Sequence, residues 1–386
     1  MRFFFRTLVS IIGSRLLSAI LTFLTSLLVL KFSSIEEYGK YFFSLSIITL
    51  FTTLPNIGIN NKFIYSHIKN EKVNYYLVAK VIIILLLLFL SFFINTIYQY
   101  DYIFCVLSGL SISLFESVLT LLQAREKFTK YSLYLPIKSV IILILTFILV
   151  NNDFDPIFAY YCFSLISVLI FIIYCFNELR DLVFEDLSKA YGLVTLSAGF
   201  LLFELSALLI IRAETWLLKY FTDLSIIQSE SLGIYGTIFS ICTGLSIVSN
   251  SVISLLLPKI RENRSYLEKS KLILMFLSGL VFCIVYYSLS VYVIKFIKPE
   301  ILSITTKYMM FIVFGMLLSF MGSLFRLKLV NDKREKELNY IYISQLIITL
   351  VFGASFIYIY GVSGAFISFF IVRLYGTFIM WYKIKS

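Results

Sequence analysis

Long apolar stretches follow one another along almost the whole chain, from Leu8 to Tyr382, with short polar gaps between them. Each is about 20 residues long, the length at which an α-helix crosses the roughly 30 Å hydrocarbon core of a bilayer. The sequence therefore predicts an all-α membrane protein with twelve transmembrane helices and no room for a soluble catalytic domain. The predicted spans are roughly 8–30, 41–60, 75–97, 102–122, 132–150, 156–176, 191–218, 232–256, 271–294, 303–325, 339–359 and 362–382.

The residue composition argues against an enzyme. Hydrophobic residues make up 60% of the chain and charged residues only 14%. The five cysteines all fall in apolar stretches without paired spacing, and His67 is the only histidine. Histidine-based metal sites and nucleophile triads are thereby excluded. We expect no catalytic residues, no metal site and no bound cofactor, and a transporter in place of an enzyme.

The charges of the connections set the orientation, because short loops rich in Lys and Arg stay on the cytoplasmic side. Alternate connections, together with both termini, hold 22 of the 33 Lys and Arg residues, whereas the opposite connections hold 5. We therefore expect an even number of spans with both termini in the cytoplasm. This asymmetry accounts for the net charge of +11 without any nucleic acid partner.

Two comparable halves are visible. The motif Gly-x-Tyr occurs at Gly39 before the second stretch and at Gly233 before the eighth. These places are equivalent in a duplication of six helices, an arrangement common in transporters with a site at the repeat interface. We expect two six-helix bundles, residues 1–180 and 181–386. Pro55 interrupts the second stretch and predicts a bend there.

Charged side chains inside spans are the main functional signal, since each costs several kcal/mol unless it faces a cavity or a partner. Glu116 and Lys138 lie at similar depth on adjacent helices and are interpreted as a structural ion pair, with snorkelling or function as alternatives. Lys307 is near a helix end and is expected to snorkel. Five further charges inside spans mark the candidate site: Arg15, Glu204, Arg212, Glu214 and Arg373.

Cations outnumber anions among these residues, so a cavity lined by them would favour an anionic group. The planar fork of arginine matches phosphate in particular. A phosphorylated or pyrophosphorylated cargo is therefore predicted. Three alternatives stay open: Arg15 could snorkel towards the cytoplasm, Glu204 and Arg373 could form structural pairs, and Arg212 could satisfy Glu214.

Several local patterns resemble one known family. An acidic-aromatic-glycine turn, Glu36–Tyr41, precedes the second stretch, and Leu122–Lys127 follows the fourth. Gly233–Tyr235, Leu257–Lys259 and Tyr360–Ala365 match turns around later helices. In order and spacing, over essentially the whole chain, these patterns resemble the Wzx-type O-antigen flippases of the multidrug/oligosaccharidyl-lipid/polysaccharide (MOP) exporter superfamily. That family often has aspartate near the outer end of the seventh span, where this chain has Glu214.

The resemblance implies a MATE-like fold of two six-helix bundles in the bacterial inner membrane. It implies a flippase that moves undecaprenyl-pyrophosphate-linked oligosaccharide from the cytoplasmic to the periplasmic leaflet by alternating access. Arg15, Arg212 and Arg373 would contact the pyrophosphate or acidic sugars. Glu204 or Glu214 would couple transport to a proton or sodium gradient. Expected partners are the lipid-linked oligosaccharide, membrane lipids, a polysaccharide polymerase and a chain-length regulator.

Two other functions compete with this interpretation. A multidrug exporter of the same superfamily would move soluble cations, and an anionic cavity would suit it better than the cationic excess seen here. An integral membrane polysaccharide polymerase usually carries a substantial outward loop with functional arginines. The largest outward gaps of this chain are about a dozen residues long, which disfavours a polymerase.

Overall fold

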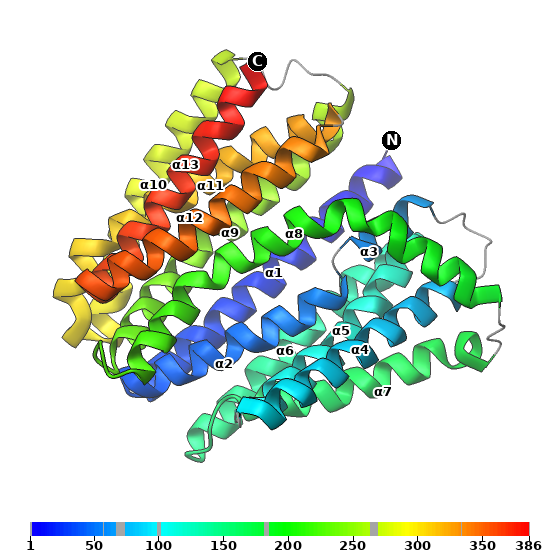
Figure 1. Ribbon diagram of the computed structural model, residues 1–386, viewed down its shortest axis with the longest axis horizontal. Coiled ribbons are helices and arrows are strands. Elements are labelled where there is room, and N and C mark those ends of the chain that lie inside the picture. Colours follow the sequence, from blue (N-terminus) through cyan, green and yellow to red (C-terminus); the bar gives the residue numbers. More distant parts are fainter. Residues whose placement is uncertain are drawn as a thin grey trace. The chain divides into compact units, whose positions relative to one another are not determined.

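A computed structural model describes residues 2–56, 58–66, 74–98, 102–180, 185–262, 269–332 and 334–385. Its described elements are all helical, as the apolar stretches predict (Figure 1). The elements are α1 (Arg2–Phe32), α2 (Ile35–Thr53), η1 (Leu54–Asn56), α3 (Ile59–Ser66), α4 (Asn74–Tyr98), α5 (Ile103–Ala124), α6 (Phe128–Asn151), α7 (Phe158–Arg180), α8 (Glu185–Asp223), α9 (Ser231–Glu262), α10 (Lys269–Ile297), η3 (Pro299–Ile301), α11 (Leu302–Asn331), α12 (Glu335–Tyr360) and α13 (Val362–Lys385).

Within the described residues, nine helical segments are long and apolar enough to cross a membrane. They lie on α1, α4 to α7 and α10 to α13. The protein is therefore a multi-pass helical membrane protein. The predicted spans on α2, α8 and α9 are not among the nine. α2 ends at Thr53, ahead of Pro55, and parts of α8 and α9 lie outside the residues whose side chains the structure describes. Ser231–Ser246 of α9 is a shorter apolar helix. The count of twelve spans and the cytoplasmic termini stay predictions.

The chain forms two compact units. Unit 1 comprises Met1–Thr22 and Ser44–Leu205, and unit 2 comprises Phe23–Phe43 and Ser206–Ser386. Three helices, α1, α2 and α8, are thus divided between the units. The predicted division between residues 180 and 181 borders on residues 181–184, which lie outside the described part of the chain. That division stays a prediction.

Unit 1 is built around α5, which packs against α4, α6 and α7. Phe115 of α5 is fully buried and meets Phe163 of α7 edge to face, with ring centroids 5.6 Å apart. Gly109 lets α5 approach α2, since a Cβ there would lie 2.6 Å from the carbonyl oxygen of Ile48. The helix pair α5–α7 is therefore the core against which the rest of unit 1 packs.

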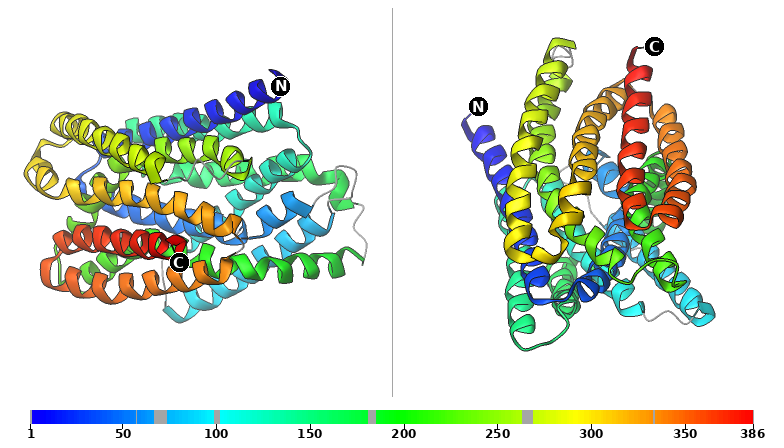
Figure 2. Two further views of the ribbon diagram at one scale, coloured as in Figure 1. Left: turned by 90° about the horizontal axis from the view of Figure 1, so that it is seen from above. Right: turned by 90° about the vertical axis from the view of Figure 1, so that its left-hand side faces the viewer.

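In unit 2, α11, α12 and α13 lie side by side, and α9 and α10 pack against α11 (Figures 1 and 2). Aromatic rings fill the interior. Tyr235 of α9 stacks on Phe366 of α13, and Phe239 meets Phe369 of α13 edge to face. α10 has its apolar side chains exposed along most of its length, as expected for a helix with one face towards lipid.

The two Gly-x-Tyr motifs meet each other in unit 2. A Cβ at Gly39 would lie 2.8 Å from the backbone nitrogen of Gly233, and one at Gly233 would lie 1.8 Å from the carbonyl oxygen of Ile35. Nearby, the hydroxyl group of Tyr38 donates a hydrogen bond to Ser240 Oγ at 2.8 Å. Glycine at both positions is what allows the starts of α2 and α9 to cross at this distance.

Candidate functional site

A cavity of about 340 Å³ lies inside unit 2 and carries three arginines, Arg212, Arg326 and Arg373. We call it the arginine cavity. Its described lining contains no carboxylate. It is lined by Ala207, Ile211 and Arg212 of α8, Phe239, Thr243 and Ser246 of α9, Met316, Ser319, Gly322, Ser323 and Arg326 of α11, Tyr342 and Gln345 of α12, and Phe369, Arg373, Gly376, Thr377 and Met380 of α13.

The arginine side chains keep donors unused. The Nε atoms of Arg212 and Arg373 are buried and have no hydrogen-bond partner within the described protein. The guanidinium of Arg373 lies over the ring of Phe369, 4.8 Å from its centroid, which fixes its direction by a cation–π contact. Unsatisfied buried donors are costly, and an anionic ligand with several oxygens would satisfy them. The cavity is therefore suited to a phosphate-type anion.

Helical spacing places the polar residues of the cavity on one face of each helix. On α11, Ser319, Gly322, Ser323 and Arg326 follow the i, i+3, i+4, i+7 pattern of a single helix face. The hydroxyl groups of Ser319 and Ser323 donate to the carbonyls four residues earlier. Their oxygen lone pairs stay available as acceptors, so this face can also accept hydrogen bonds from a ligand.

A close contact between Gly376 and Gln345 forms part of the cavity lining. A Cβ at Gly376 of α13 would lie 1.7 Å from Nε2 of Gln345, so only glycine lets the glutamine side chain cross at this position. That side chain donates from Nε2 to the carbonyl of Val372 at 3.1 Å. Its Oε1 has no partner within the described residues. The α12–α13 contact thus holds a polar amide in place beside Arg373.

Glu214 is the carboxylate nearest to these arginines by position along α8, but it does not line the cavity. Its side chain is 1% exposed, and neither carboxylate oxygen has a hydrogen-bond partner within the described residues. Arg212 does not satisfy it, since residues two apart on a helix do not face each other. The attraction that acts on Glu214 comes from Arg373 on α13. Arg373 therefore connects the cavity electrostatically to a buried acid.

Arg15 lies in unit 1 and is not among the residues that line the arginine cavity. Its side chain is exposed and donates from Nη2 to the hydroxyl oxygen of Tyr131, 3.1 Å away on α6. Of the three arginines predicted to share a site, the structure brings together Arg212 and Arg373.

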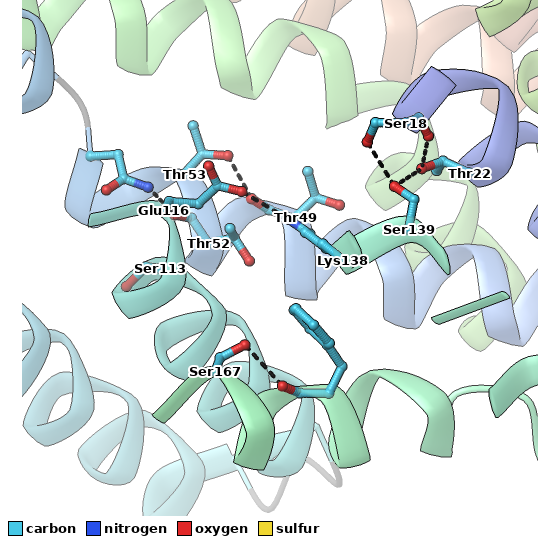
Figure 3. Close-up of polar contacts among 12 residues, drawn as sticks. Ser18, Thr22, Thr49, Thr52, Thr53, Ser113, Glu116, Lys138, Ser139 and Ser167 are labelled. Carbon is cyan, nitrogen blue, oxygen red and sulfur yellow. Dashed lines mark hydrogen bonds and ion pairs between the residues drawn. The ribbon is translucent and has the colours of Figure 1, made fainter. Parts of the chain in front are cut away.

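Glu116 and Lys138 also lie in unit 1, where Lys138 Nζ is 2.8 Å from Glu116 Oε1. The two side chains are 30% and 24% exposed. Figure 3 shows the pair beside the stretch of α2 that carries Thr49, Thr52 and Thr53. The structure shows the predicted ion pair between adjacent helices. That the pair is purely structural stays a prediction.

Hydroxyl groups continue this polar region towards α1. Ser139, next to Lys138, is 2.7 Å from Ser18 and 3.2 Å from Thr22, measured between side-chain oxygens (Figure 3). On α2 the hydroxyls of Thr49 and Thr52 donate to backbone carbonyls four residues earlier. Hydroxyl groups bonded in this way are satisfied inside a membrane protein, and their oxygens still accept.

The bend predicted at Pro55 is a complete break in the helix. α2 ends at Thr53, η1 follows, Gly58 adopts a positive φ of 70°, and α3 starts at Ile59. Proline removes a backbone donor, and glycine is the residue that tolerates this φ without strain. The break leaves backbone groups on both sides that need partners within the membrane.

Two charged side chains of unit 1 supply those partners. The ammonium of Lys80, a residue 0% exposed, donates to Pro55 O and to Asn56 Oδ1, each at 2.6 Å. The carboxylate of Glu204 accepts from the backbone N–H of Gly58 at 2.7 Å. A cation at the carboxyl end of one helix and an anion at the amino end of the next complement the helix dipoles. Glu204 is thus placed at the helix break, and it is not among the residues that line the arginine cavity.

Two charged residues described above, Arg326 and Lys80, are not among the candidate residues predicted from the sequence. Arg326 falls just beyond the predicted tenth span, but α11 continues to Asn331 and carries it into the cavity wall. Its spacing from Ser319 and Ser323 was the available signal. Lys80 lies within the predicted third span, six residues after Asn74, and its charge inside an apolar stretch was the available signal. The structure adds its contact with the carbonyl oxygen of Pro55.

Comparison with known proteins agrees with this architecture. A family model described as polysaccharide biosynthesis protein matches residues 4–264. No curated protein matches the chain significantly. Among solved structures, the lipid II flippase MurJ in an inward closed conformation aligns with a TM-score of 0.68 at 16% identity, covering 96% of this chain and 86% of that one.

Multidrug transporters of the MATE family share the fold as well. The MATE transporter DinF-BH in complex with R6G aligns with a TM-score of 0.63 at 14% identity, covering 98% of this chain and 95% of that one. An inward-facing MATE family transporter of the MOP superfamily aligns at 0.65 with 12% identity, covering 96% and 94%. At these identities the likeness shows a shared fold, the one found in MurJ and in the MATE transporters.

Proposed function

Because the chain belongs to the polysaccharide biosynthesis protein family, we propose that it is a flippase for lipid-linked oligosaccharides. It would move undecaprenyl-pyrophosphate-linked repeat units from the cytoplasmic to the periplasmic leaflet of the bacterial inner membrane. Its product would serve O-antigen or another surface polysaccharide. The likeness in fold to a lipid II flippase supports this class of cargo.

One observation carries the proposal: the arginine cavity has three guanidinium groups and no carboxylate in its described lining. A pyrophosphate carries several negative oxygens, and arginine binds such groups through paired hydrogen bonds. The free Nε donors of Arg212 and Arg373 offer two of those bonds. A soluble organic cation would be repelled by the same cavity, which disfavours the multidrug exporter.

The remaining parts of the mechanism follow as proposals. Twelve spans with cytoplasmic termini would form two six-helix bundles, residues 1–180 and 181–386, that alternate access to the cargo. Arg15 would contact pyrophosphate or acidic sugar from the first bundle. Glu204 at the helix break and the buried Glu214 beside Arg373 would take up a proton or a sodium ion. A polymerase and a chain-length regulator would act on the product.

Complementation tests the proposed function. In a strain that lacks its own oligosaccharide flippase, the protein should restore surface polysaccharide, and R212A and R373A should fail to do so at equal amounts in the membrane. K40A is the matched control, because the side chain of Lys40 is 71% exposed and pairs with the exposed Glu36. Restored polysaccharide with both arginine variants would remove the proposed site. Drug resistance without complementation would establish the multidrug exporter.

A further inference from the structure

A second cavity, of about 180 Å³, lies in unit 2 between α9, α10 and α11. We call it the apolar cavity. Leu245 of α9, Met275 and Phe282 of α10, and Leu317 and Phe320 of α11 line it, and the described lining contains no charged group. Met316 lines both this cavity and the arginine cavity. The two spaces are therefore neighbours that share the flexible side chain of Met316 as part of their walls.

The apolar cavity lies on the lipid side of the arginine cavity. α10, which supplies one of its walls, exposes Leu274, Val281 and Val285 by 68%, 61% and 51%. Apolar side chains exposed on a membrane-spanning helix face the hydrocarbon of the bilayer. A chain that passes from the arginine cavity through the apolar cavity would reach lipid beside α10.

The chemistry of the proposed cargo requires such a passage. In a polyprenyl-pyrophosphate the first isoprene unit is bonded directly to the phosphate, so it lies within a few ångströms of whatever holds the phosphates. Leaving that hydrocarbon among arginines and serines would forgo the free energy of apolar burial. A phosphate site for this cargo therefore needs an apolar space beside it.

We infer that the apolar cavity binds the first isoprene units of the polyprenyl chain while Arg212, Arg326 and Arg373 hold the phosphates. This inference rests on the proposed function and extends it to the lipid part of the cargo. In this arrangement the polyprenyl chain passes Met316 into the apolar cavity. The rest of the polyprenyl chain extends between α9 and α10 into the bilayer. Unbranched methionines at positions 316 and 275 adapt to a flexible, irregular chain.

Gly279 offers a way to fill the cavity. It belongs to the lining, and a Cβ there would lie 2.7 Å from Cδ1 of Leu317, the flexible end of another lining side chain. Leucine at 279 would therefore occupy space that a prenyl chain needs. Gly192 of α8 is a matched control, since no other atom lies within 4 Å of a Cβ built there.

The test compares two probes on the purified full-length protein in lipid nanodiscs: inorganic pyrophosphate and farnesyl pyrophosphate. The unmodified protein should bind farnesyl pyrophosphate at least ~10-fold more tightly, because its chain is buried. G279L should bring the affinity for farnesyl pyrophosphate down to that for pyrophosphate and leave the latter unchanged. G192L should behave like the unmodified protein. If G279L does not fold, M275Q serves, since it places a polar group in the cavity at similar volume.

Two results would overturn the inference while sparing the proposed function. Equal affinity for both probes would mean that bilayer lipid fills the apolar cavity. If both G279L and M275Q still bind farnesyl pyrophosphate more tightly than pyrophosphate, the prenyl chain binds outside the apolar cavity. Failure of the folded, unmodified protein to bind either probe would contradict the proposed function itself.

Discussion

Arg373 takes part in more of the described interactions around the arginine cavity than Arg212 does. It lines the arginine cavity, lies over Phe369 and attracts the buried Glu214. R373A should weaken pyrophosphate binding by about 10- to 100-fold, the usual worth of a hydrogen bond to a charged group. R373K should recover only part of the lost pyrophosphate affinity, because lysine lacks the planar fork of the guanidinium group. Binding measured by calorimetry checks both, and full affinity in R373A would exclude its contact with phosphate.

Lys80 should matter for stability because of the acceptors it satisfies. K80M leaves Pro55 O and Asn56 Oδ1 without their donor in a fully buried place. An unsatisfied buried group costs about 1–3 kcal/mol, so the thermal midpoint of the detergent-solubilised protein should fall by several degrees. K40M, at an exposed lysine, should change it little. Equal midpoints for the two variants would show that the helix break does not depend on Lys80.

Glu37 provides a pH-dependent contribution outside the membrane spans. Its carboxylate accepts from the backbone N–H of Ser34 at 2.8 Å and from its hydroxyl at 2.9 Å, a capping box that starts α2. These bonds, the backbone one first, lower the pKa of Glu37 below its ordinary 4.5. The stabilisation is therefore present above pH 4.5 and is lost as the pH falls through the lowered value.

Thermal melts of the unmodified protein and E37Q check this sign. The difference between their midpoints should be steady from pH 7 down to about pH 5 and should narrow as Glu37 takes up a proton at lower pH. A difference that grows on acidification would show that the carboxylate is not held by Ser34.

At the scale of elements, the crossing of α2 and α9 depends on glycine. G233A forces a Cβ to within 1.8 Å of the Ile35 carbonyl oxygen, so the helices must separate. Overpacking of this kind costs about 1–3 kcal/mol. G192A, where no atom lies near, should be neutral or slightly stabilising because alanine favours helix. Folding yield and thermal midpoint measure both, and equal behaviour would contradict the close crossing.

The elements also show what the sequence could and could not reveal. Helices follow from apolar length, and Arg212 and Arg373 stand out because they interrupt apolar stretches. Charge and depth carry no information on which helix faces meet, so they do not decide whether Arg15 of unit 1, which contacts Tyr131, shares a site with Arg212 and Arg373. Arg326 was missed because α11 runs beyond the end of its apolar stretch. Glu204 and Lys80 acquire partners only through the break at Pro55.

At the scale of the whole molecule, the loop charges predict both termini in the cytoplasm. Single cysteines introduced at Ser229 in the α8–α9 connection and at Lys127 in the α5–α6 connection should react with an impermeant thiol reagent from opposite sides of intact cells. We expect labelling from outside at position 229 only, in a background without the native cysteines. Labelling of both would show that the number of spans between them is even.

Transbilayer movement of the cargo is the central claim and can be measured directly. Proteoliposomes holding the purified protein and an undecaprenyl-pyrophosphate-linked oligosaccharide are treated with an impermeant enzyme that modifies only exposed sugars. The unmodified protein should render nearly all of the lipid accessible over time, whereas the R212A/R373A double variant should leave the inner half protected. Accessibility no faster than in protein-free vesicles, or equal rates for the double variant, would contradict the account.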